Sequence, residues 1–321
     1  MEQIMAKKKR KKGTENIILY VIFGIILVLV IALVIMIVKW NKGQESDYDP
    51  DAVTTEFDTE PNDYILPLSA EQVSGKADDG VVTILTLGNS PFADDYGSNN
   101  LAKTIGDIYG ATVINGGIEG SYITCKNSDY SEDEEQDGVS LPFIAGAVAS
   151  GDFSVPESAA PLVSEQAVLA VQTLKQTDMS SVDAIFIMYD LEDYVDHRPL
   201  GSESETDITC IYGAVRSSIE KLRAAYPYIR VVYLSQPASG KTIDGFFVDG
   251  DVHNIGEGLL SDYVTFELSA TATAGASFVD IYYGAVNVDQ RDEFITNDYH
   301  LNDKGAKSVA DRVHELIPLQ P

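Results

Sequence analysis

The chain has 321 residues and a formal net charge of −28 at pH 7, and 45% of its residues are hydrophobic, which is enough for a substantial buried core. Residues 1–43 hold eight of the 22 basic residues and only two of the 50 acidic ones, so the remainder carries −34. Such an acidic surface repels the phosphates of nucleic acids, and we expect no nucleic-acid partner.

The first predicted element is a membrane-spanning helix. An apolar run covers residues 17–38 and matches the ~20 residues that a helix needs to cross a bilayer. The run is too long for the core of a signal peptide, and no small-residue cleavage site follows it. The basic cluster Lys7–Lys12 precedes it, so the N-terminus stays in the cytoplasm and the rest is exported. We predict a basic cytoplasmic tail over 1–16, a transmembrane helix over 17–39, and a single-pass protein of the cell membrane.

The exported part is predicted to contain a tether and one domain. Residues 40–79 are rich in Asp, Glu, Ser, Thr and Pro, which is the composition of a flexible, solvated tether. From residue 80 to residue 321, short apolar runs alternate with longer amphipathic ones, which predicts an α/β domain whose five-stranded, mostly parallel sheet is covered on both faces. The strands are expected at 81–87, 111–114, 182–189, 229–234 and 278–283, and the helices at 99–109, 141–149, 164–175, 207–225, 258–270 and 303–317.

Two residues at the ends of predicted strands are candidates for chemistry. The first strand stops at Gly88-Asn89-Ser90-Pro91, which puts a hydroxyl at a strand's carboxyl end, where open α/β sheets bind ligands. Ser90 has an alternative role as the cap of a helix that begins at Pro91. His300 follows the fifth strand and precedes the last helix, so it belongs to the same edge of the sheet. A neighbouring imidazole is what makes a serine hydroxyl a competent nucleophile near pH 7.

The order of four segments resembles the conserved blocks of the SGNH/GDSL hydrolases over roughly residues 80–317. They are Gly-Asn-Ser after the first strand, a Gly-containing turn after the second, an acidic turn after the third, and Asp-Tyr-His-Leu-Asn before the last helix. Members of that family are serine esterases, lipases and carbohydrate deacetylases with a three-layer α/β/α, flavodoxin-like fold. The resemblance implies that Ser90 is the nucleophile, that His300 is its general base, and that the amides of Ser90 and Gly120 stabilise the oxyanion. A turn that needs positive φ explains Gly120 equally well.

The sequence departs from the family pattern at two positions. Glu192 occupies the place of the family's oxyanion-stabilising Asn, and an ionised carboxylate cannot donate a hydrogen bond. The family's acid lies three residues before the histidine, where this chain has Asn297, with Asp298 two residues before. The resemblance therefore implies Asp298, or Asn297 in its place, as the residue that orients His300.

These observations favour a membrane-anchored, extracytoplasmic serine hydrolase that acts on small acyl esters, with O-acetyl groups of envelope or extracellular polysaccharide as one substrate class. One alternative is a catalytically impaired binding or scaffold module of the same fold, and another is an O-acyltransferase that uses the same site. The sequence does not specify the substrate or the acyl group.

We expect no metal and no cofactor. No His, Cys, Asp and Glu cluster has metal-ligand spacing. Ser239-Gly240-Lys241-Thr242 resembles the end of a phosphate-binding loop, but Ser235 stands where that loop needs Gly, so we expect no nucleotide. The acidic run over 132–137 is interpreted as a solvated loop. Cys125 and Cys210 permit a disulfide without implying one.

Overall fold

A computed structural model describes residues 25–33, 36, 60–75, 79–93 and 100–319. The chain divides into two compact units, Met1–Asp58 and Thr59–Pro321. The predicted tail over 1–16, and most of the predicted transmembrane helix over 17–39, lie outside the described residues, and so does the tether up to residue 59. Residues 25–33 and 36 are helical with exposed side chains. Among the residues that the structure describes, no helix is both long enough and apolar enough to span a membrane.

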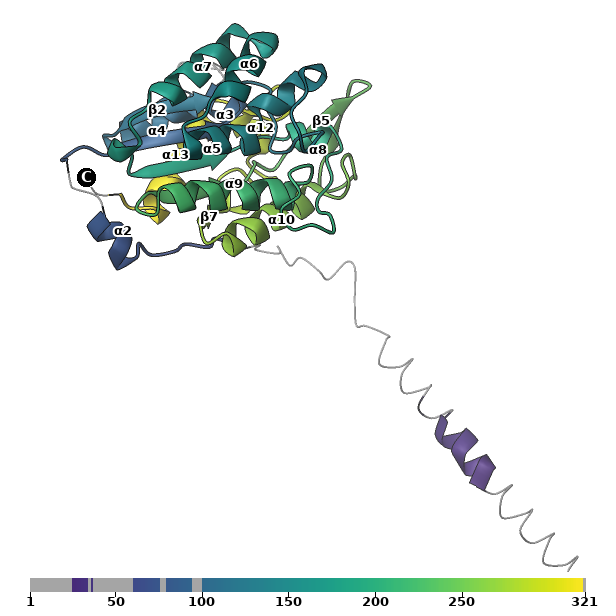
Figure 1. Ribbon diagram of the computed structural model, residues 1–321. Coiled ribbons are helices and arrows are strands. Elements are labelled where there is room, and N and C mark those ends of the chain that lie inside the picture. Colours follow the sequence, from purple (N-terminus) through teal and green to yellow (C-terminus); the bar gives the residue numbers. More distant parts are fainter. Residues whose placement is uncertain (1–24, 34–35, 37–59, 76–78, 94–99, 320–321) are drawn as a thin grey trace, which may run out of the picture. The chain divides into compact units, whose positions relative to one another are not determined.

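The second unit is built on a five-stranded sheet with the order β2-β1-β3-β4-β7 (Figure 1). Every neighbouring pair is parallel, so the predicted mostly parallel sheet is confirmed. This order is the flavodoxin-like one, in which the chain leaves β1 toward β2 on one side and returns to β3 on the other. The strands are β1 (Thr83–Gly88), β2 (Thr112–Gly117), β3 (Ala184–Met188), β4 (Arg230–Leu234) and β7 (Ser277–Val279).

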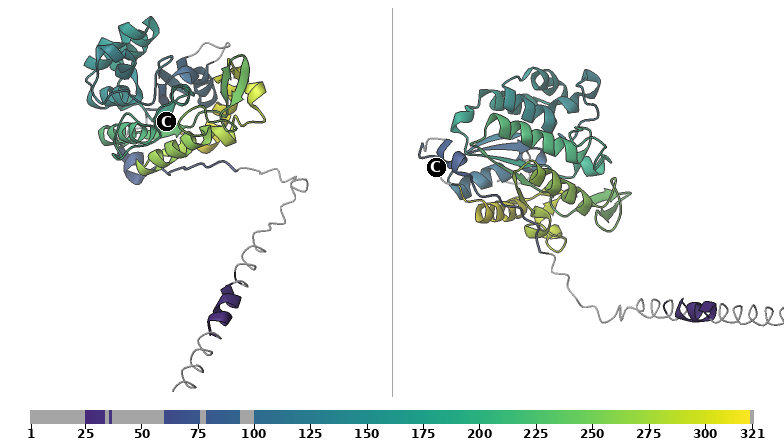
Figure 2. Two further views of the ribbon diagram at one scale, coloured as in Figure 1. Left: turned by 90° about the vertical axis from the view of Figure 1, so that its right-hand side faces the viewer. Right: turned by 60° about the horizontal axis from the view of Figure 1, so that its bottom comes forward.

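Helices cover both faces of this sheet, as its side chains require. Ile84 and Phe186 belong to one buried cluster, while their chain neighbours Leu85 and Ile185 belong to another. Because successive strand residues point to opposite faces, both faces are buried, and Figure 2 shows helices on either side. The first cluster includes residues of α4 (Leu101–Tyr109) and α13 (Asp303–Leu316), and the second includes residues of α5 (Leu141–Ser150), α7 (Glu165–Gln176), α9 (Ile211–Ala225) and α10 (Leu260–Thr273).

Several short elements were not predicted from the sequence, and some of them shape the edge of the sheet where its strands end. Two are antiparallel hairpins, β5–β6 and β8–β9. Their strands are β5 (Gly240–Ile243), β6 (Phe246–Asp249), β8 (Ile295–Thr296) and β9 (His300–Leu301), and the other elements are α2 (Ala70–Gly75), α3 (Ser90–Ala93), η1 (Glu132–Val139), α6 (Ser154–Val163), η2 (Met179–Ser181), α8 (Glu192–Val195), α11 (Ile281–Gly284) and α12 (Arg291–Phe294).

Part of the predicted tether packs on the folded unit. Tyr64 forms an antiparallel bridge with Phe278 of β7, with N···O distances of 2.9 and 2.8 Å. Asp63 forms an ion pair with Arg312 of α13. The range 40–79 therefore includes a segment that belongs to the same compact unit as the sheet.

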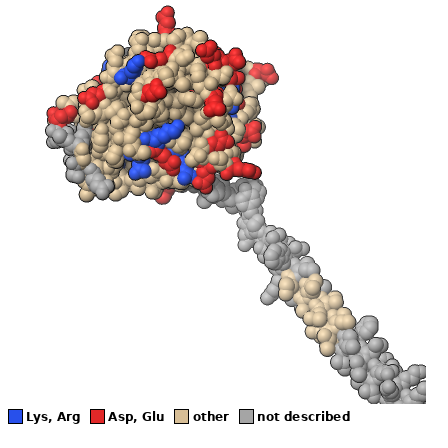
Figure 3. All heavy atoms as spheres, in the orientation of Figure 1, with Lys and Arg blue, Asp and Glu red and all other residues tan. Residues whose placement is uncertain are grey.

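The surface of this unit is acidic, as the charge count predicts. Figure 3 shows Asp and Glu side chains scattered over most of the visible face, whereas Lys and Arg occupy few places on it. A face of this kind offers little to a polyanion.

Candidate active site

Ser90 and Asp190 lie at the point where the strand order of the sheet reverses. Ser90 is the first residue of α3, two positions after the end of β1, and Asp190 follows β3 by two residues. β1 and β3 are adjacent and parallel, so both carboxyl ends reach the same edge. Ligands of open α/β sheets bind in the crevice at this switch point.

The turn that presents Ser90 depends on Gly88 and Asn89. A Cβ at Gly88 would lie 1.8 Å from the carbonyl oxygen of Met188, so only glycine lets β1 approach β3 this closely. The Asn89 carbonyl accepts hydrogen bonds from Phe92 N and Ala93 N, both at 3.0 Å, and these bonds close the turn. Ser90 is only 2% exposed in this position, so a substrate must reach it through a narrow opening or a movement of its surroundings.

The Asn89 side chain joins the turn to the end of β3. Its Nδ2 donates to Asp190 Oδ1 at 2.7 Å and to the carbonyl of Ser121 at 3.0 Å, and its Oδ1 accepts from Asp190 N at 2.9 Å. Asn89 is fully buried. These bonds fix the orientation of the Asp190 carboxylate.

Ser90 and His300, the candidate nucleophile and base, both interact with the carboxylate of Asp190. Its Oδ2 lies 3.8 Å from His300 Nδ1. The pKa of Asp190 is raised to about 7, chiefly by burial and then by the charge of Glu192, whereas His300 and hydrogen bonds from the side chains of Asn89 and Ser90 oppose the rise. Sequence reasoning missed Asp190, although a polar residue directly after a predicted strand was a signal that could have found it.

His300 is presented by the β8–β9 hairpin. Thr296 pairs with His300 across it, and the turn between them places Asn297 at φ 46° and Asp298 at φ 72°. Asn and Asp tolerate this left-handed region better than other non-glycine residues do. Asn302 then caps α13 by accepting from Lys304 N and Gly305 N, at 2.9 and 3.1 Å, so His300 lies two residues before the cap of this helix.

The Asp298 carboxylate is bound to a different element. One oxygen accepts from Thr242 N at 2.8 Å and the other from Thr242 Oγ1 at 2.6 Å, while the Asp298 carbonyl accepts from Ser239 Oγ. Thr242 belongs to β5, so the segment that resembles a phosphate-binding loop forms part of a hairpin. Asn297 is exposed in the turn.

Glu192 and Gly120, the other predicted oxyanion residues, differ in their hydrogen-bonding groups. Glu192 opens α8, and its carboxylate accepts a hydrogen bond from Tyr299 Oη at 3.1 Å. Burial, and then the charge of Glu192, raise the pKa of Tyr299. Gly120 adopts φ 68°, a conformation that favours glycine. Outside regular helices and strands, the amides of Ser90 and Gly120 donate to no backbone carbonyl of a described residue.

The remaining candidates from the sequence take no part in the contacts described above. Cys125 and Cys210 are both buried free thiols, so they do not form a disulfide. Burial raises the pKa of Cys125 to about 12. The acidic run forms η1, in which Asp137 is buried and accepts from the backbone of Lys126 and Asn127. Of the described residues, no cluster of three or more His, Cys, Asp and Glu could hold a metal ion.

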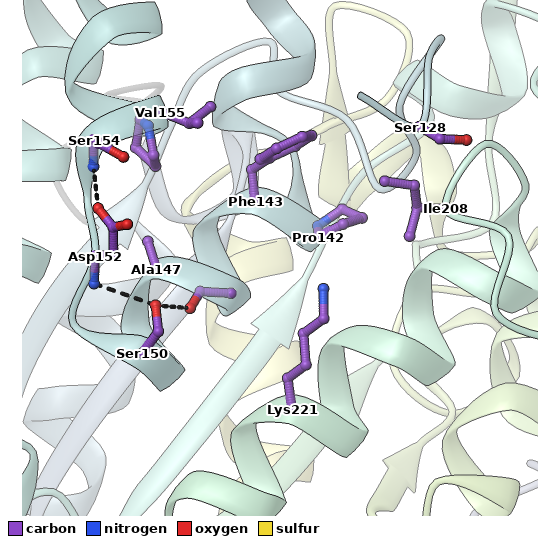
Figure 4. A pocket seen from close by; sticks show the side chains of 12 residues that line it. Ser128, Pro142, Phe143, Ala147, Ser150, Asp152, Ser154, Val155, Ile208 and Lys221 are labelled. Atoms are coloured by element: carbon purple, nitrogen blue, oxygen red, sulfur yellow. Dashed lines mark hydrogen bonds between the residues drawn. The ribbon is translucent and has the colours of Figure 1, made fainter. Parts of the chain in front are cut away.

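A separate pocket of about 260 Å³ lies between α5, α6 and α9 (Figure 4). Phe143, Pro142 and Ile208 form apolar walls, and Lys221 extends toward them from α9. None of its lining residues contributes to the Ser90 site. The pocket offers one exposed ammonium group, that of Lys221.

Comparisons with known proteins identify the fold. No protein-family profile matches the sequence, and no curated protein matches it. Two crystal structures have a TM-score of 0.50, and one of them is a Lactobacillus plantarum protein with 18% identity, for which the match covers 74% of this chain and 96% of that one. A possible lipase from Chitinophaga pinensis has 14% identity and a TM-score of 0.45, with coverage of 73% and 98%. The two structures at 0.50 support the α/β fold and do not assign an activity.

Proposed function

We propose that the chain is an SGNH/GDSL-type serine hydrolase in which Ser90 is the nucleophile and His300 the general base. The observation that carries the proposal is the meeting of the two residues at Asp190, although 210 positions separate them in the sequence. They meet at the switch point of the sheet, where this fold class binds ligands. The order of motifs along the chain supports the same assignment.

The proposed reaction is acyl transfer through a covalent intermediate. The Ser90 hydroxyl gives its proton to His300 while its oxygen attacks the acyl carbon, and the proton then passes to the departing alcohol oxygen. Water repeats the sequence and releases the acid and free Ser90. The amides of Ser90 and Gly120 are the proposed oxyanion donors, as the resemblance to the SGNH/GDSL hydrolases implies.

The proposed substrates are small acyl esters, including O-acetyl groups on envelope or extracellular polysaccharide. This part of the proposal rests on the predicted anchor, since the apolar run over 17–38 and the preceding lysines favour a single-pass protein with an exported domain. The low exposure of Ser90, 2%, favours a short acyl group over a long chain.

One observation favours a second candidate, a non-hydrolytic binding module of the same fold. Glu192 places a carboxylate where the family has an oxyanion donor, and negative charge there opposes the transition state. The two candidates differ in turnover and not in architecture.

The test uses the full chain with a short-chain aryl ester and a fluorophosphonate probe. The proposed hydrolase should turn over the ester and become labelled at Ser90, and Ser90→Ala should abolish both signals. Ser158→Ala, an exposed serine on α6, is the matched control and should retain both. Activity that survives Ser90→Ala overturns the nucleophile, and a folded wild-type chain that is neither active nor labelled favours the binding module.

A further inference from the structure

The two oxygens of the Asp190 carboxylate have different surroundings. Oδ1 accepts from Asn89 Nδ2 at 2.7 Å and lies 3.4 Å from Glu192 N. Oδ2 is buried and accepts no hydrogen bond from any described residue, and it lies 3.8 Å from His300 Nδ1. The carboxylate is therefore held by one oxygen and presents the other to the imidazole.

Asp298, the acid that the family pattern implies, has its carboxylate engaged elsewhere. Thr242 donates to both of its oxygens, from the amide and from the hydroxyl. These bonds, with the one from Ser239 to the Asp298 carbonyl, fasten the β5–β6 hairpin to the loop that carries His300. Turning Asp298 toward His300 would break the two hydrogen bonds that it accepts from Thr242 of this hairpin.

We infer that Asp190, from the end of β3, is the carboxylate that orients His300. Asp298 has a structural role instead, because its hydrogen bonds join the β8–β9 hairpin to the β5–β6 hairpin. This inference rests on the proposed function and adds a positioning residue to it. With Nδ1–H donating to Asp190 Oδ2, His300 keeps Nε2 as the basic nitrogen that takes the Ser90 proton. Asp190 does not take that proton. It remains an anion opposite the imidazolium that forms during attack. The imidazolium becomes neutral again when its proton passes to the departing oxygen.

The groups around Asp190 account for its behaviour with pH. Glu192 on α8 and Tyr299 in the turn before β9 are acidic groups close enough to interact with its charge, and His300 brings an opposing positive charge when it is protonated. Burial raises the pKa of Asp190 to about 7, so the carboxylate that the imidazolium needs forms as pH rises through neutrality. Activity should therefore increase with pH across this range.

The experiment compares the isosteric variants Asp190→Asn and Asp298→Asn in the full chain. Ring resonances of His300, assigned with His300→Gln, should titrate at a pH lower by about 1 unit in Asp190→Asn, because a negative charge near the imidazole is lost. In the same variant kcat for the aryl ester should fall by about 10²–10⁴-fold, with KM changed less than about threefold. Asp298→Asn should leave the His300 titration in place, keep kcat within about threefold, and lower the melting temperature.

The opposite pattern, in which Asp298→Asn shifts the titration and Asp190→Asn does not, overturns the inference. If Asp190→Asn fails to fold, the ¹⁵N chemical shifts of the His300 ring in the wild-type protein serve as the test. A hydrogen on Nδ1 of the neutral ring supports the inference, and a hydrogen on Nε2 overturns it. The NMR measurement does not require turnover. Failure of the proposed function, seen as an inactive and unlabelled wild type, is thereby separated from failure of the Asp190 assignment.

Discussion

Asn89 and Asp190 exchange two hydrogen bonds across the carboxyl ends of β1 and β3: Asn89 Nδ2 donates to Asp190 Oδ1 at 2.7 Å, and Asp190 N donates to Asn89 Oδ1 at 2.9 Å. The amide side chain of Asn89 serves here as donor and acceptor at once. The residue before the candidate nucleophile therefore holds the carboxylate that faces the candidate base.

Asn89→Asp should destabilise the protein more than Asn89→Ala does. Alanine removes two buried hydrogen bonds to Asp190, an expected loss of about 2–4 kcal/mol in the free energy of unfolding. Aspartate adds a second carboxylate at hydrogen-bond distance from the first, and like charges in a buried site cannot both ionise without a large penalty. Urea unfolding near pH 7 measures the difference, and Asn127→Ala, an exposed residue, should leave the midpoint unchanged. Equal midpoints for Asn89→Ala and wild type would show that the exchange contributes little.

Glu192→Gln should raise the rate of ester hydrolysis. Tyr299 Oη donates to Glu192 Oε1, so a glutamine would keep its oxygen toward Tyr299 and turn its Nε2 to the other side. The change removes a negative charge and adds a donor, and one oxyanion donor is worth about 10²–10³ in rate when its geometry is ideal. Since glutamine is longer than the family's asparagine, we expect about tenfold in kcat. The control is Glu203→Gln on the surface, and a fall in kcat for Glu192→Gln would contradict the expectation.

Stability should fall as pH rises from about 5 to about 7.5. Burial raises the pKa of Asp193 to about 6 and of Asp190 to about 7, and it raises the pKa of Glu267 well above its ordinary value. The folded chain thus keeps protons that the unfolded chain has released, so it binds more protons and loses stability with rising pH. The loss begins above the ordinary values of 3.8 and 4.5 and continues up to the folded-state pKa values.

Glu267→Gln separates this effect from general changes in charge. Gln236, with its amide turned to donate, places its nitrogen 2.7 and 2.6 Å from the two Glu267 oxygens, and a glutamine preserves one such contact. Thermal unfolding at the two pH values should show a smaller loss for Glu267→Gln than for wild type. A slope equal to that of wild type would mean that Glu267 does not titrate in this range.

Much of the fold follows from local patterns in the sequence. Each of the five predicted strands overlaps an observed strand, because buried parallel strands are short apolar runs bounded by polar turns. The two hairpins were missed because their strands are only two to four residues long. The β5–β6 turn uses Asp244 and Gly245, both with positive φ, a signal too short to stand out between longer elements.

The site was predictable only in part, for a physical reason. Ser90 and His300 could be named because each follows a strand and belongs to a recognisable segment. The placement of Asp190 between them depends on β1 and β3 being adjacent, which is a property of strand order. Asp298 is nearer to His300 in the sequence, yet its carboxylate is bound by Thr242, 56 residues away.

A chain that begins at Asp79 should be less stable than one that begins at Thr59. The bridge from Tyr64 satisfies the N–H and C=O of Phe278, on the side of β7 that faces away from β4, and Phe278 is fully buried. Removing the segment leaves these groups without partners, at a cost of about 1–3 kcal/mol for each. It also removes the Asn62 amide from Asp280 and the Asp63 carboxylate from Arg312. We expect the melting temperature to fall by roughly 5–10 °C.

The matched variant for this comparison is Tyr64→Ala in the chain that begins at Thr59. It retains both backbone hydrogen bonds to Phe278 and removes a side chain that is 38% exposed, so its melting temperature should lie close to that of the parent. If Tyr64→Ala matched the shorter chain, the ring and not the backbone bridge would be the source of stability. Equal melting temperatures for the two chain lengths would show that residues 60–75 add no stability and belong to the tether. The expected difference would show that they are part of the folded unit and extend the edge of the sheet.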